Sequence, residues 1–297
     1  MGIWMSWSAF KQYKRTCGKQ YKYQRIDKKD PPKKDSRHNA IVGTVVQDVF
    51  EDFYNDELWR RKDNTSQILL ERTDKYFWEY LDNNYINFDD VTCRYDSKTE
   101  PLKECLEIIP KTLEGIKREK FLGPYAKSEV NLKVRFGPKD FLVGYLDFVI
   151  RRANDEVLII DGKSSRHREK YVDEDQLYFY ALMFYLRYKT LPDKLGFLYY
   201  RFADDPEEAV DWLPVKKSKI KELKLEIEDA IYDIKQRKFP ANPHYSHCQW
   251  CQYEQICDER MAQKRDNRIK RQKNSKKKKI DTDFTDGKAN IGFNDLK

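Results

Sequence analysis

The chain has 297 residues, of which 39% are hydrophobic and 36% are charged, so it suits one large or two small globular domains with a heavily charged surface. No run of about 18 apolar residues occurs, which excludes a membrane-spanning helix. The net charge is +8, but residues 260–279 hold 11 Lys or Arg and one Asp, so this segment carries +10 and the remainder −2. Such a basic run is either a solvated tail or a segment attracted to nucleic-acid phosphates.

Helical patterns come first along the chain. Apolar residues on one face predict a helix from residue 44, and further helices are expected at 6–17, about 65–82 and about 102–121. Alternating patterns then predict strands at 128–136, 141–150 and 156–161, followed by a helix at 175–188, strands at 196–202 and 208–215, and a helix at about 216–237. This order predicts an α/β fold whose central mixed sheet is flanked by helices.

The domain organisation follows from the same patterns. We expect one globular body over residues 1–259, with a helical insertion at 60–125 and a Cys-rich closing segment at 244–259. Residues 260–297 are expected to form a basic, disordered tail. No signal peptide is recognised, so we expect a cytoplasmic protein without disulfides, in a microbial or phage-infected cell.

Two acidic residues are predicted to face each other across a hairpin. If the strands 141–150 and 156–161 pair, the numbers of opposed residues sum to about 308, and Asp147 and Asp161 meet that condition. Directly opposed like charges destabilise a sheet. Lys163 lies two residues after Asp161, on the same face of the strand. Glu129, on the preceding strand, comes near the same level.

A divalent cation between the carboxylates would remove this repulsion. Mg²⁺ is bound by carboxylates together with water and phosphate oxygens, so Asp147 and Asp161 are candidate ligands for Mg²⁺ or Mn²⁺, and Glu129 is a further candidate. Lys163 is then placed to orient a water molecule or to stabilise charge on a phosphate. The alternative is that Asp161 and Lys163 only mark the end of a strand with a local ion pair.

Three short motifs resemble the PD-(D/E)XK nuclease superfamily. GYLD at 144–147 fits its G-x-x-D motif and DGK at 161–163 fits D-x-K, while QLYFY at 176–180 is similar to the Q-x-x-x-Y motif of the RecB-like branch. Without the preceding motifs, the last segment would be taken for an apolar core helix. The resemblance implies a restriction-endonuclease-like core, and its implied catalytic residues are Asp147, Asp161, Lys163, Gln176 and Tyr180.

Three cysteines are clustered near the end of the globular body. Cys248, Cys251 and Cys257 need a fourth soft ligand to complete a tetrahedral or cuboidal site, and Cys17 is a candidate. Thiolate sites suit Zn²⁺ or an iron–sulfur cluster, and the spacing does not separate the two. Unligated buried thiols are the remaining alternative. Competitors for the fourth position are Cys93, Cys105, His244 and His247.

The cysteine pattern resembles the iron–sulfur members of the RecB-like branch, including the AddB-type and CRISPR-associated exonucleases. In them one upstream Cys and a C-x₂-C-x₅-C segment bind a [4Fe–4S] cluster. The resemblance implies that Cys17, Cys248, Cys251 and Cys257 hold such a cluster, which joins the N- and C-terminal segments. The order of Ser, aromatic, Tyr and Cys residues in SWSAFKQYKRTC at 6–17 agrees with the N-terminal motif of that branch.

Gln47 departs from this resemblance. These nucleases usually carry a His metal ligand in a G-x-x-x-H context, and GTVVQ places Gln47 at that position. An amide oxygen can bind a hard cation, but it is a weaker Mn²⁺ ligand than imidazole. The departure therefore puts metal preference and rate in doubt. His38, in a nearby polar loop, is expected to be an ordinary surface histidine.

The resemblance implies a divalent-metal-dependent deoxyribonuclease. We expect an exonuclease on single-stranded DNA or DNA ends that works with protein partners in DNA recombination, repair or replication, with no role at a membrane. The alternative, which Gln47 favours, is a weak or inactive nucleic-acid-binding or assembly protein that keeps the fold and the cluster.

Overall fold

The computed structural model describes residues 2–32, 38–61, 63–87, 101–168 and 172–286. The chain divides into two compact units. Unit 1 comprises residues 1–11 and 35–238, and unit 2 comprises residues 12–34 and 239–297. Residues far apart in the sequence therefore share each unit. No described helix combines the length and the apolar character that a membrane span requires.

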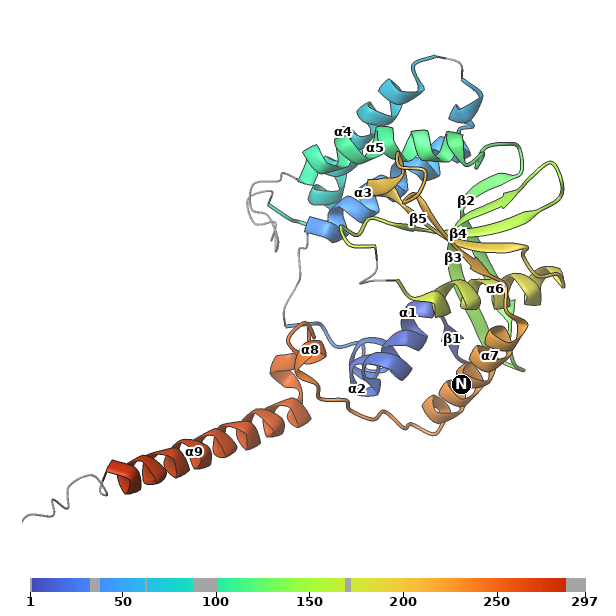
Figure 1. Ribbon diagram of the computed structural model, residues 1–297. Coiled ribbons are helices and arrows are strands. Elements are labelled where there is room, and N and C mark those ends of the chain that lie inside the picture. Colours follow the sequence, from blue (N-terminus) through green and yellow to red (C-terminus); the bar gives the residue numbers. More distant parts are fainter. Residues whose placement is uncertain (1, 33–37, 62, 88–100, 169–171, 287–297) are drawn as a thin grey trace, which may run out of the picture. The chain divides into compact units, whose positions relative to one another are not determined.

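Unit 1 is built on a six-stranded mixed sheet with the order β1-β3-β4-β5-β6, in which β2 pairs with β3. Pairing is parallel for β1 with β3 and for β4 with β5, and antiparallel for the other neighbours. The predicted mixed α/β sheet is confirmed (Figure 1). The strands are β1 (Trp4–Met5), β2 (Ala126–Arg135), β3 (Phe141–Arg151), β4 (Val157–Lys163), β5 (Lys194–Tyr199) and β6 (Val210–Pro214).

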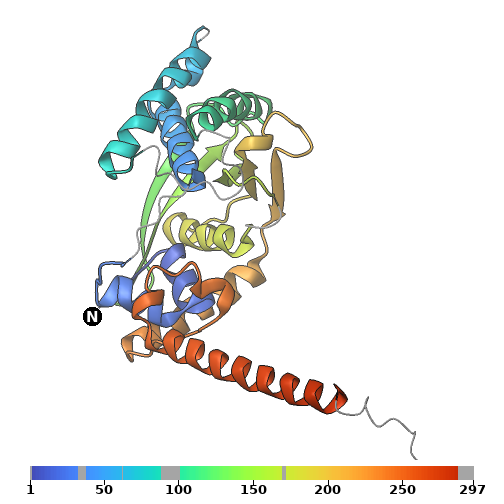
Figure 2. The same ribbon diagram turned by 90° about the vertical axis from the view of Figure 1, so that its left-hand side faces the viewer.

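Helices cover both faces of this sheet. Leu158 and Ile160 of β4 join the core beneath α3 and α5, whereas Asp161 bonds to a residue of α6 and so points to the other face. Figure 2 shows the group of α3, α4 and α5 separate from α6. The helices of unit 1 are α1 (Trp7–Phe10), α3 (His38–Asn55), α4 (Thr65–Asn83), α5 (Pro101–Arg118), α6 (Glu174–Tyr188) and α7 (Lys217–Lys235).

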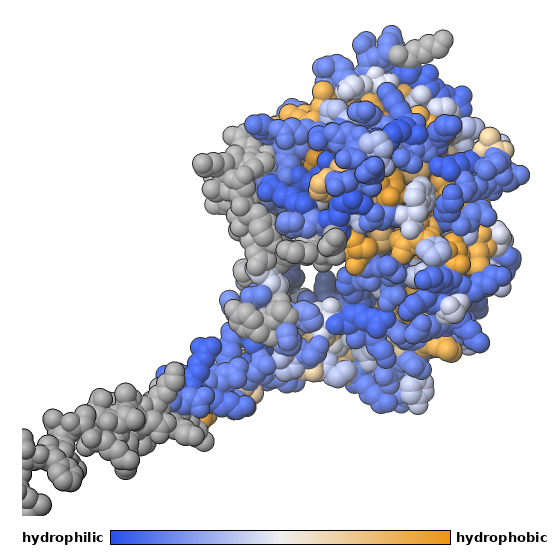
Figure 3. All heavy atoms as spheres, viewed as in Figure 1, coloured by the Kyte–Doolittle hydropathy of each residue, from blue (hydrophilic) through white to orange (hydrophobic). Residues whose placement is uncertain are grey.

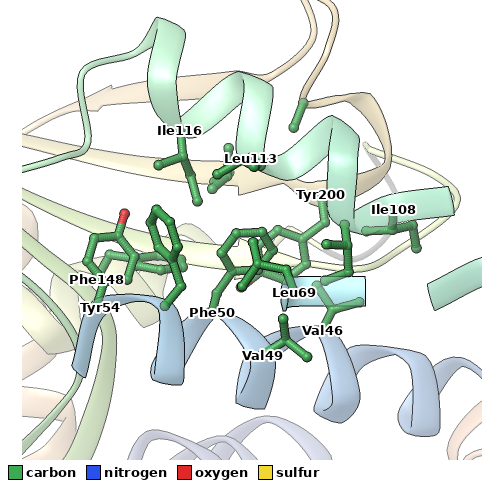
Figure 4. Close-up of a cluster of buried hydrophobic side chains, with 14 of the residues drawn as sticks. Val46, Val49, Phe50, Tyr54, Leu69, Ile108, Leu113, Ile116, Phe148 and Tyr200 are labelled. Atoms are coloured by element: carbon green, nitrogen blue, oxygen red, sulfur yellow. The ribbon is translucent and has the colours of Figure 1, made fainter. Parts of the chain in front are cut away.

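The main core lies between α3, α4, α5 and the sheet (Figure 4). Val46, Val49 and Phe50, on the apolar face predicted for α3, are fully buried. They lie among side chains from α5 and the sheet, including Ile116 and Phe148. This packing fixes α3 beside β2, to which Gln47 of α3 also bonds. On the face shown in Figure 3 hydrophilic residues predominate, as the charged composition requires.

Unit 2 joins the two ends of the chain. Two π-helical segments (Lys11–Thr16 and Lys22–Ile26) flank α2 (Gly18–Tyr21), and the later part contains α8 (Tyr245–Cys248), a 3₁₀ turn (Glu254–Ile256) and α9 (Asp258–Asp286). Tyr21 stacks on Phe239, with ring centroids 6.3 Å apart, and Tyr23 packs on Tyr253 at 5.6 Å. Aromatic contacts between distant segments therefore hold the unit together.

The segment after residue 258 differs from the expectation of a disordered tail, because α9 is helical from Asp258 to Asp286. Its composition explains this difference. Lys, Arg and Gln are strong helix formers, and Asp258 and Glu259 in the first turn match the helix dipole. Residues 287–297 of the expected tail lie outside the described part.

Candidate active site

The hairpin of β3 and β4 has the predicted register. Phe148 pairs with Ile160, so the numbers sum to 308 and Asp147 comes opposite Asp161 one residue further on. Asp161 is only 1% exposed. Asp147 is tied to the neighbouring strand because its Oδ2 accepts a hydrogen bond of 2.8 Å from the backbone N–H of Gly162. Two carboxylates are thus held together where β4 ends.

Three polar side chains surround Asp161. Gln176 of α6 donates through Nε2 to Asp161 Oδ1 at 2.6 Å, and Lys163 Nζ forms an ion pair with Oδ2 of the same carboxylate. Lys163 also donates to Gln176 Oε1 at 3.0 Å. The Gln176 amide makes a further bond of 3.0 Å to the Tyr180 hydroxyl. The structure therefore brings together Asp147, Asp161, Lys163, Gln176 and Tyr180.

Glu129 lies at the same level of the sheet. Ser128 pairs with Phe148 and Val130 with Leu146, which places Glu129 opposite Asp147. Its φ of 49° is left-handed, which is strained for a residue other than glycine. Gln47 of α3 donates a hydrogen bond through Nε2 to Glu129 Oε1. The side-chain direction, which the sequence did not indicate, is therefore toward α3.

The alternation of side chains in β3 reverses at this level. Ile150 belongs to the core beneath α3 and α5. A Cβ on Gly144 would instead meet Met183 and Tyr180 of α6, on the other face, although 144 and 150 have the same parity. An unbroken strand would place both on one face. The strained residue Glu129 of β2 lies level with Asp147, between Gly144 and Ile150 of β3. The change in side-chain direction therefore occurs where the acidic residues meet.

Burial and neighbouring acids raise the pKa values of the acidic groups in the site. Burial raises the pKa of Asp147 well above its ordinary range, and the nearby Asp161 and Glu129 add to the effect. Burial also raises the pKa of Asp161, although Lys163 opposes this. Asp48 of α3 has its pKa raised to about 6 by burial and by neighbouring acids, including Glu129. Negative charge is therefore costly here, and a cation would be favoured.

The residues present fit a divalent cation in chemical type. Carboxylate and amide oxygens are its usual ligands, and Asp147, Asp161, Glu129 and Gln47 supply them. Within the described ranges, however, no group of three or more His, Cys, Asp or Glu has the arrangement of a metal site. Glu129 is already bonded to Gln47, and Asp161 to Lys163 and Gln176.

Sequence reasoning missed Tyr200, which follows β5. Its ring is 2% exposed and its hydroxyl is buried without a hydrogen-bond partner among the described residues. A Cβ at Gly162 would overlap that hydroxyl and ring, so glycine is required in the DGK motif. Burial raises the pKa of Tyr200, and the charges of Asp147 and Asp161 raise it further. No sequence signal links Tyr200 to the site.

His38 is not a surface histidine, because it is only 3% exposed and pairs with Glu104 of α5. The polar loop predicted there ends where α3 begins, so the residue is drawn into the packed interface of α3 and α5. Glu104 also forms ion pairs with Arg166 and Arg201. Arg201 Nε donates at 2.6 Å to the carbonyl oxygen of Ser164. This buried network therefore reaches the residue next to Lys163.

The four candidate cysteines lie together in unit 2. They line one cavity of about 30 Å³. Burial raises the pKa of Cys251, and the other three thiols contribute. Of the competitors, His247 also lines the cavity, Cys105 is buried in the core of unit 1, and Cys93 lies outside the described residues. The sulfur set is that of a zinc or iron–sulfur site, although the described residues show no metal-binding arrangement there either. The residues that share this cavity are Cys17, Cys248, Cys251 and Cys257.

Comparisons with known proteins identify one family. The family model described as "PD-(D/E)XK nuclease superfamily" matches residues 5–258. Among curated proteins, none matches this chain. A solved structure titled "Crystal structure of SSO0001" is similar at 17% identity and a TM-score of 0.33, over 74% of this chain and 97% of that one. The family assignment rests on the family model and not on this distant likeness.

Proposed function

This chain belongs to the PD-(D/E)XK nuclease superfamily, and we propose that it hydrolyses phosphodiester bonds of DNA with the help of a divalent cation. The observation that carries the proposal is the pair of opposed carboxylates, the buried Asp161 and the half-buried Asp147, with Lys163 beside them. Two opposed carboxylates destabilise a sheet unless a cation lies between them. A nuclease site that binds a divalent cation accounts for both carboxylates and for Lys163.

Each side chain has a role that its contacts support. Asp147, Asp161 and Glu129 would hold Mg²⁺ or Mn²⁺, which when bound lowers the pKa of a coordinated water and neutralises charge on the phosphate. Lys163 is a cation at the same place and would orient the attacking water or stabilise the developing negative charge. Gln176 bonds to both Asp161 and Lys163, and so would hold the two in position.

Tyr180 and Gln47 are supporting residues in this proposal. Tyr180 is bonded to Gln176 and is largely buried, so it would fix the orientation of that amide. Gln47 holds Glu129 through its amide N–H. Its carbonyl oxygen would then be the group that could bind a cation, in the position where the resemblance expects a histidine.

The proposed substrate is single-stranded DNA or a DNA end, cut as an exonuclease. The test is a comparison of linear and covalently closed circular single-stranded DNA, each with Mg²⁺, with Mn²⁺ and with EDTA. We expect loss of the linear substrate only, and no loss in EDTA. Cleavage of the circle at an equal rate would contradict the exonuclease, and cleavage in EDTA would contradict the metal requirement. Asp161→Asn serves as the inactive control.

The second candidate is a nucleic-acid-binding protein that cleaves weakly or not at all. The contact between Gln47 and Glu129 favours it, because an amide replaces a stronger metal ligand and occupies one carboxylate oxygen. Binding of single-stranded DNA without cleavage in either metal would support this candidate. Gln47→His would then be expected to restore or raise cleavage in Mn²⁺.

We further infer that the four cysteines of unit 2 hold a [4Fe–4S] cluster. The support is their shared cavity and the raised pKa of Cys251, which burial and then the three neighbouring thiols produce. Bound there, the cluster would supply a link between the segments 12–34 and 239–297. The test is iron and sulfide content after anaerobic purification. We expect both in the wild type and in Cys105→Ser, and loss of both in Cys251→Ser; zinc in place of iron would contradict the cluster.

A further inference from the structure

A solvent-facing surface lies further along the two strands that carry Glu129 and Asp147, which with Asp161 form the acidic cluster. Because a Cβ on Gly144 would point to α6, its neighbour Tyr145 and the residues level with it lie on the side of the sheet away from α6. This surface is formed by β1 and by the parts of β2 and β3 that lie beyond Glu129 and Asp147 (Figure 1). Asn131 pairs with Tyr145, and Arg135 pairs with Phe141, which in turn pairs with Trp4. We call it the β1–β3 face, and its residues are Trp4, Asn131, Lys133, Arg135, Phe141 and Tyr145.

The side chains of the β1–β3 face are aromatic or polar, and two of them are cationic. Trp4 is 56% exposed and Tyr145 is 55% exposed, although large aromatic side chains are usually covered. Lys133 Nζ lies 3.7 Å from the centre of the Trp4 ring and 4.8 Å from that of Phe141. Asn131 donates to the Tyr145 hydroxyl at 3.1 Å. Flat rings and positive charges therefore alternate over a short distance.

The buried side of the same strands explains why this face is open. Leu132, Val134 and Leu142 are each at most 4% exposed, and they point away from it. Because the alternation of side chains reverses near Glu129, these three apolar residues point toward the covered side of the sheet. The aromatic and cationic residues between them then point to solvent. The exposed rings are thus a result of the strand geometry and not of a missing core.

More positive charge lies beside the β1–β3 face. A hollow of about 530 Å³ is lined by Lys133 and Arg135 of β2 together with Arg187 and Lys189 at the end of α6. Four cationic side chains around one hollow attract a polyanion, since each neutralised phosphate releases counterions.

We propose that the β1–β3 face binds the part of a single DNA strand that extends from the acidic cluster, with bases stacked on Trp4 and Tyr145 and phosphates near Lys133 and Arg135. This proposal rests on the proposed function and adds the path of the substrate. From Asp147 to Phe141 is six residues, or about 20 Å along the strand, which is a length suited to several nucleotides.

The chemistry favours an unpaired strand over other partners. Stacking on an aromatic ring needs a free base face, which a duplex does not offer, and any base suffices. A protein partner would instead be expected to bury an apolar centre with a polar rim. Here the rings and the charges are interleaved. The face also lies on the two β-strands that carry Glu129 and Asp147, which are proposed to hold the metal ion at the cleavage site.

Binding is measured by fluorescence anisotropy with labelled oligo-dT of 4, 8, 12 and 16 nucleotides, in a Lys163→Ala background that prevents cleavage. We expect Trp4→Ala and Tyr145→Ala each to weaken binding of the longer strands by roughly 5- to 100-fold, the range that stacking supports. Lys133→Ala is expected to lower the slope of log affinity against log salt by about 1. Tyr232→Ala, exposed by 61% on α7, is the matched control.

Several results would contradict DNA binding by the β1–β3 face without contradicting the proposed nuclease activity. Unchanged affinity in Trp4→Ala and Tyr145→Ala is one, and equal losses for duplex and single strands are another. Cleavage of a dinucleotide, too short to reach Trp4, separates the two proposals. It should persist in Trp4→Ala and vanish in Lys163→Ala. Absence of cleavage of strands of every length by the protein with Lys163 intact, with strand binding lost in Trp4→Ala, would reject the nuclease and keep the binding face.

Discussion

Replacing Asp147 with Asn is expected to stabilise the metal-free protein and to abolish its cleavage. The carboxylate is opposed to Asp161, and burial together with that charge raises its pKa. The amide that Asp147→Asn introduces carries no charge, yet its oxygen can still accept the N–H of Gly162, a bond of 2.8 Å in the wild type. The substitution therefore removes repulsion with little loss of hydrogen bonding.

The magnitude follows from the spacing of opposed residues. Two charges about 5 Å apart across a strand pair repel by roughly 3 kcal/mol at an effective dielectric constant of about 20. Lys163 offsets part of this, because it lowers the pKa of Asp161. We expect Asp147→Asn to raise the free energy of unfolding by about 1–3 kcal/mol, and the Tm by roughly 3–10 °C.

The effect depends on pH with a definite sign. The pKa of Asp147 in the folded state lies above its ordinary value of 3.8, so the charged form destabilises the fold. The contribution of Asp147 to the free energy of unfolding is therefore most favourable below pH 3.8. It is lost as the pH rises through the folded-state pKa of this carboxyl group. The advantage of Asp147→Asn is largest at pH 7 and shrinks toward pH 4.

The assay is thermal unfolding followed by circular dichroism in EDTA at pH 7 and pH 4, with Asp74→Asn on the exposed side of α4 as the control. Mg²⁺ at about 100 times its Kd should add about 2.7 kcal/mol to the wild type and nothing to Asp147→Asn. A lower Tm for Asp147→Asn at pH 7 in EDTA would show that Asp147 and Asp161 do not repel each other in the fold, as would an equal gain at both pH values.

Three further substitutions test other parts of the site. Glu104→Ala leaves the partly buried Arg166 and Arg201 without their buried partner and should cost about 3–5 kcal/mol in chemical unfolding, whereas the exposed Glu107→Ala should cost almost nothing. Gly162→Ala should lower stability by about 1–3 kcal/mol because its Cβ overlaps Tyr200, and an unchanged Tm would contradict the described packing. Gln47→His should lower the Mn²⁺ concentration that gives half-maximal cleavage; no change would place residue 47 outside the metal site.

The contribution of Glu104 also depends on pH. Burial by itself would raise its pKa, but hydrogen bonds from His38 and Arg201 outweigh burial and lower the pKa to about 2. A lowered carboxyl pKa means that stability is present above the ordinary value of 4.5 and is lost as the pH falls toward 2. The Glu104 network and the Asp147 pair therefore oppose each other in acid.

Local patterns in the sequence were sufficient to predict the hairpin and its register. Alternating residues on two strands and one short turn allow few pairings, so the opposition of Asp147 and Asp161 could be worked out. The apolar face of α3 was equally predictable, because helical periodicity is local. Both predictions depend on residues that are near one another in the chain.

Contacts across long sequence distances could not be predicted in this way. Glu104 meets His38 and Arg201 from positions 66 and 97 residues away, and nothing in their neighbourhood marks them as partners. The left-handed conformation of Glu129 was also hidden, because it is imposed by the surrounding sheet on a residue that does not favour it. Tertiary packing decided each of these features.

The most direct test of the proposed active site is the cleavage of end-labelled single-stranded DNA in Mn²⁺ by the wild type, Lys163→Ala and Lys194→Ala. Lys194, which pairs with Glu156 on the surface, is the matched control. We expect cleavage by the wild type and Lys194→Ala, and a loss of at least roughly 100-fold, the scale of one electrostatic group, in Lys163→Ala. Equal cleavage by all three proteins would contradict the role of Lys163, and no cleavage by any would leave the DNA-binding protein as the better account.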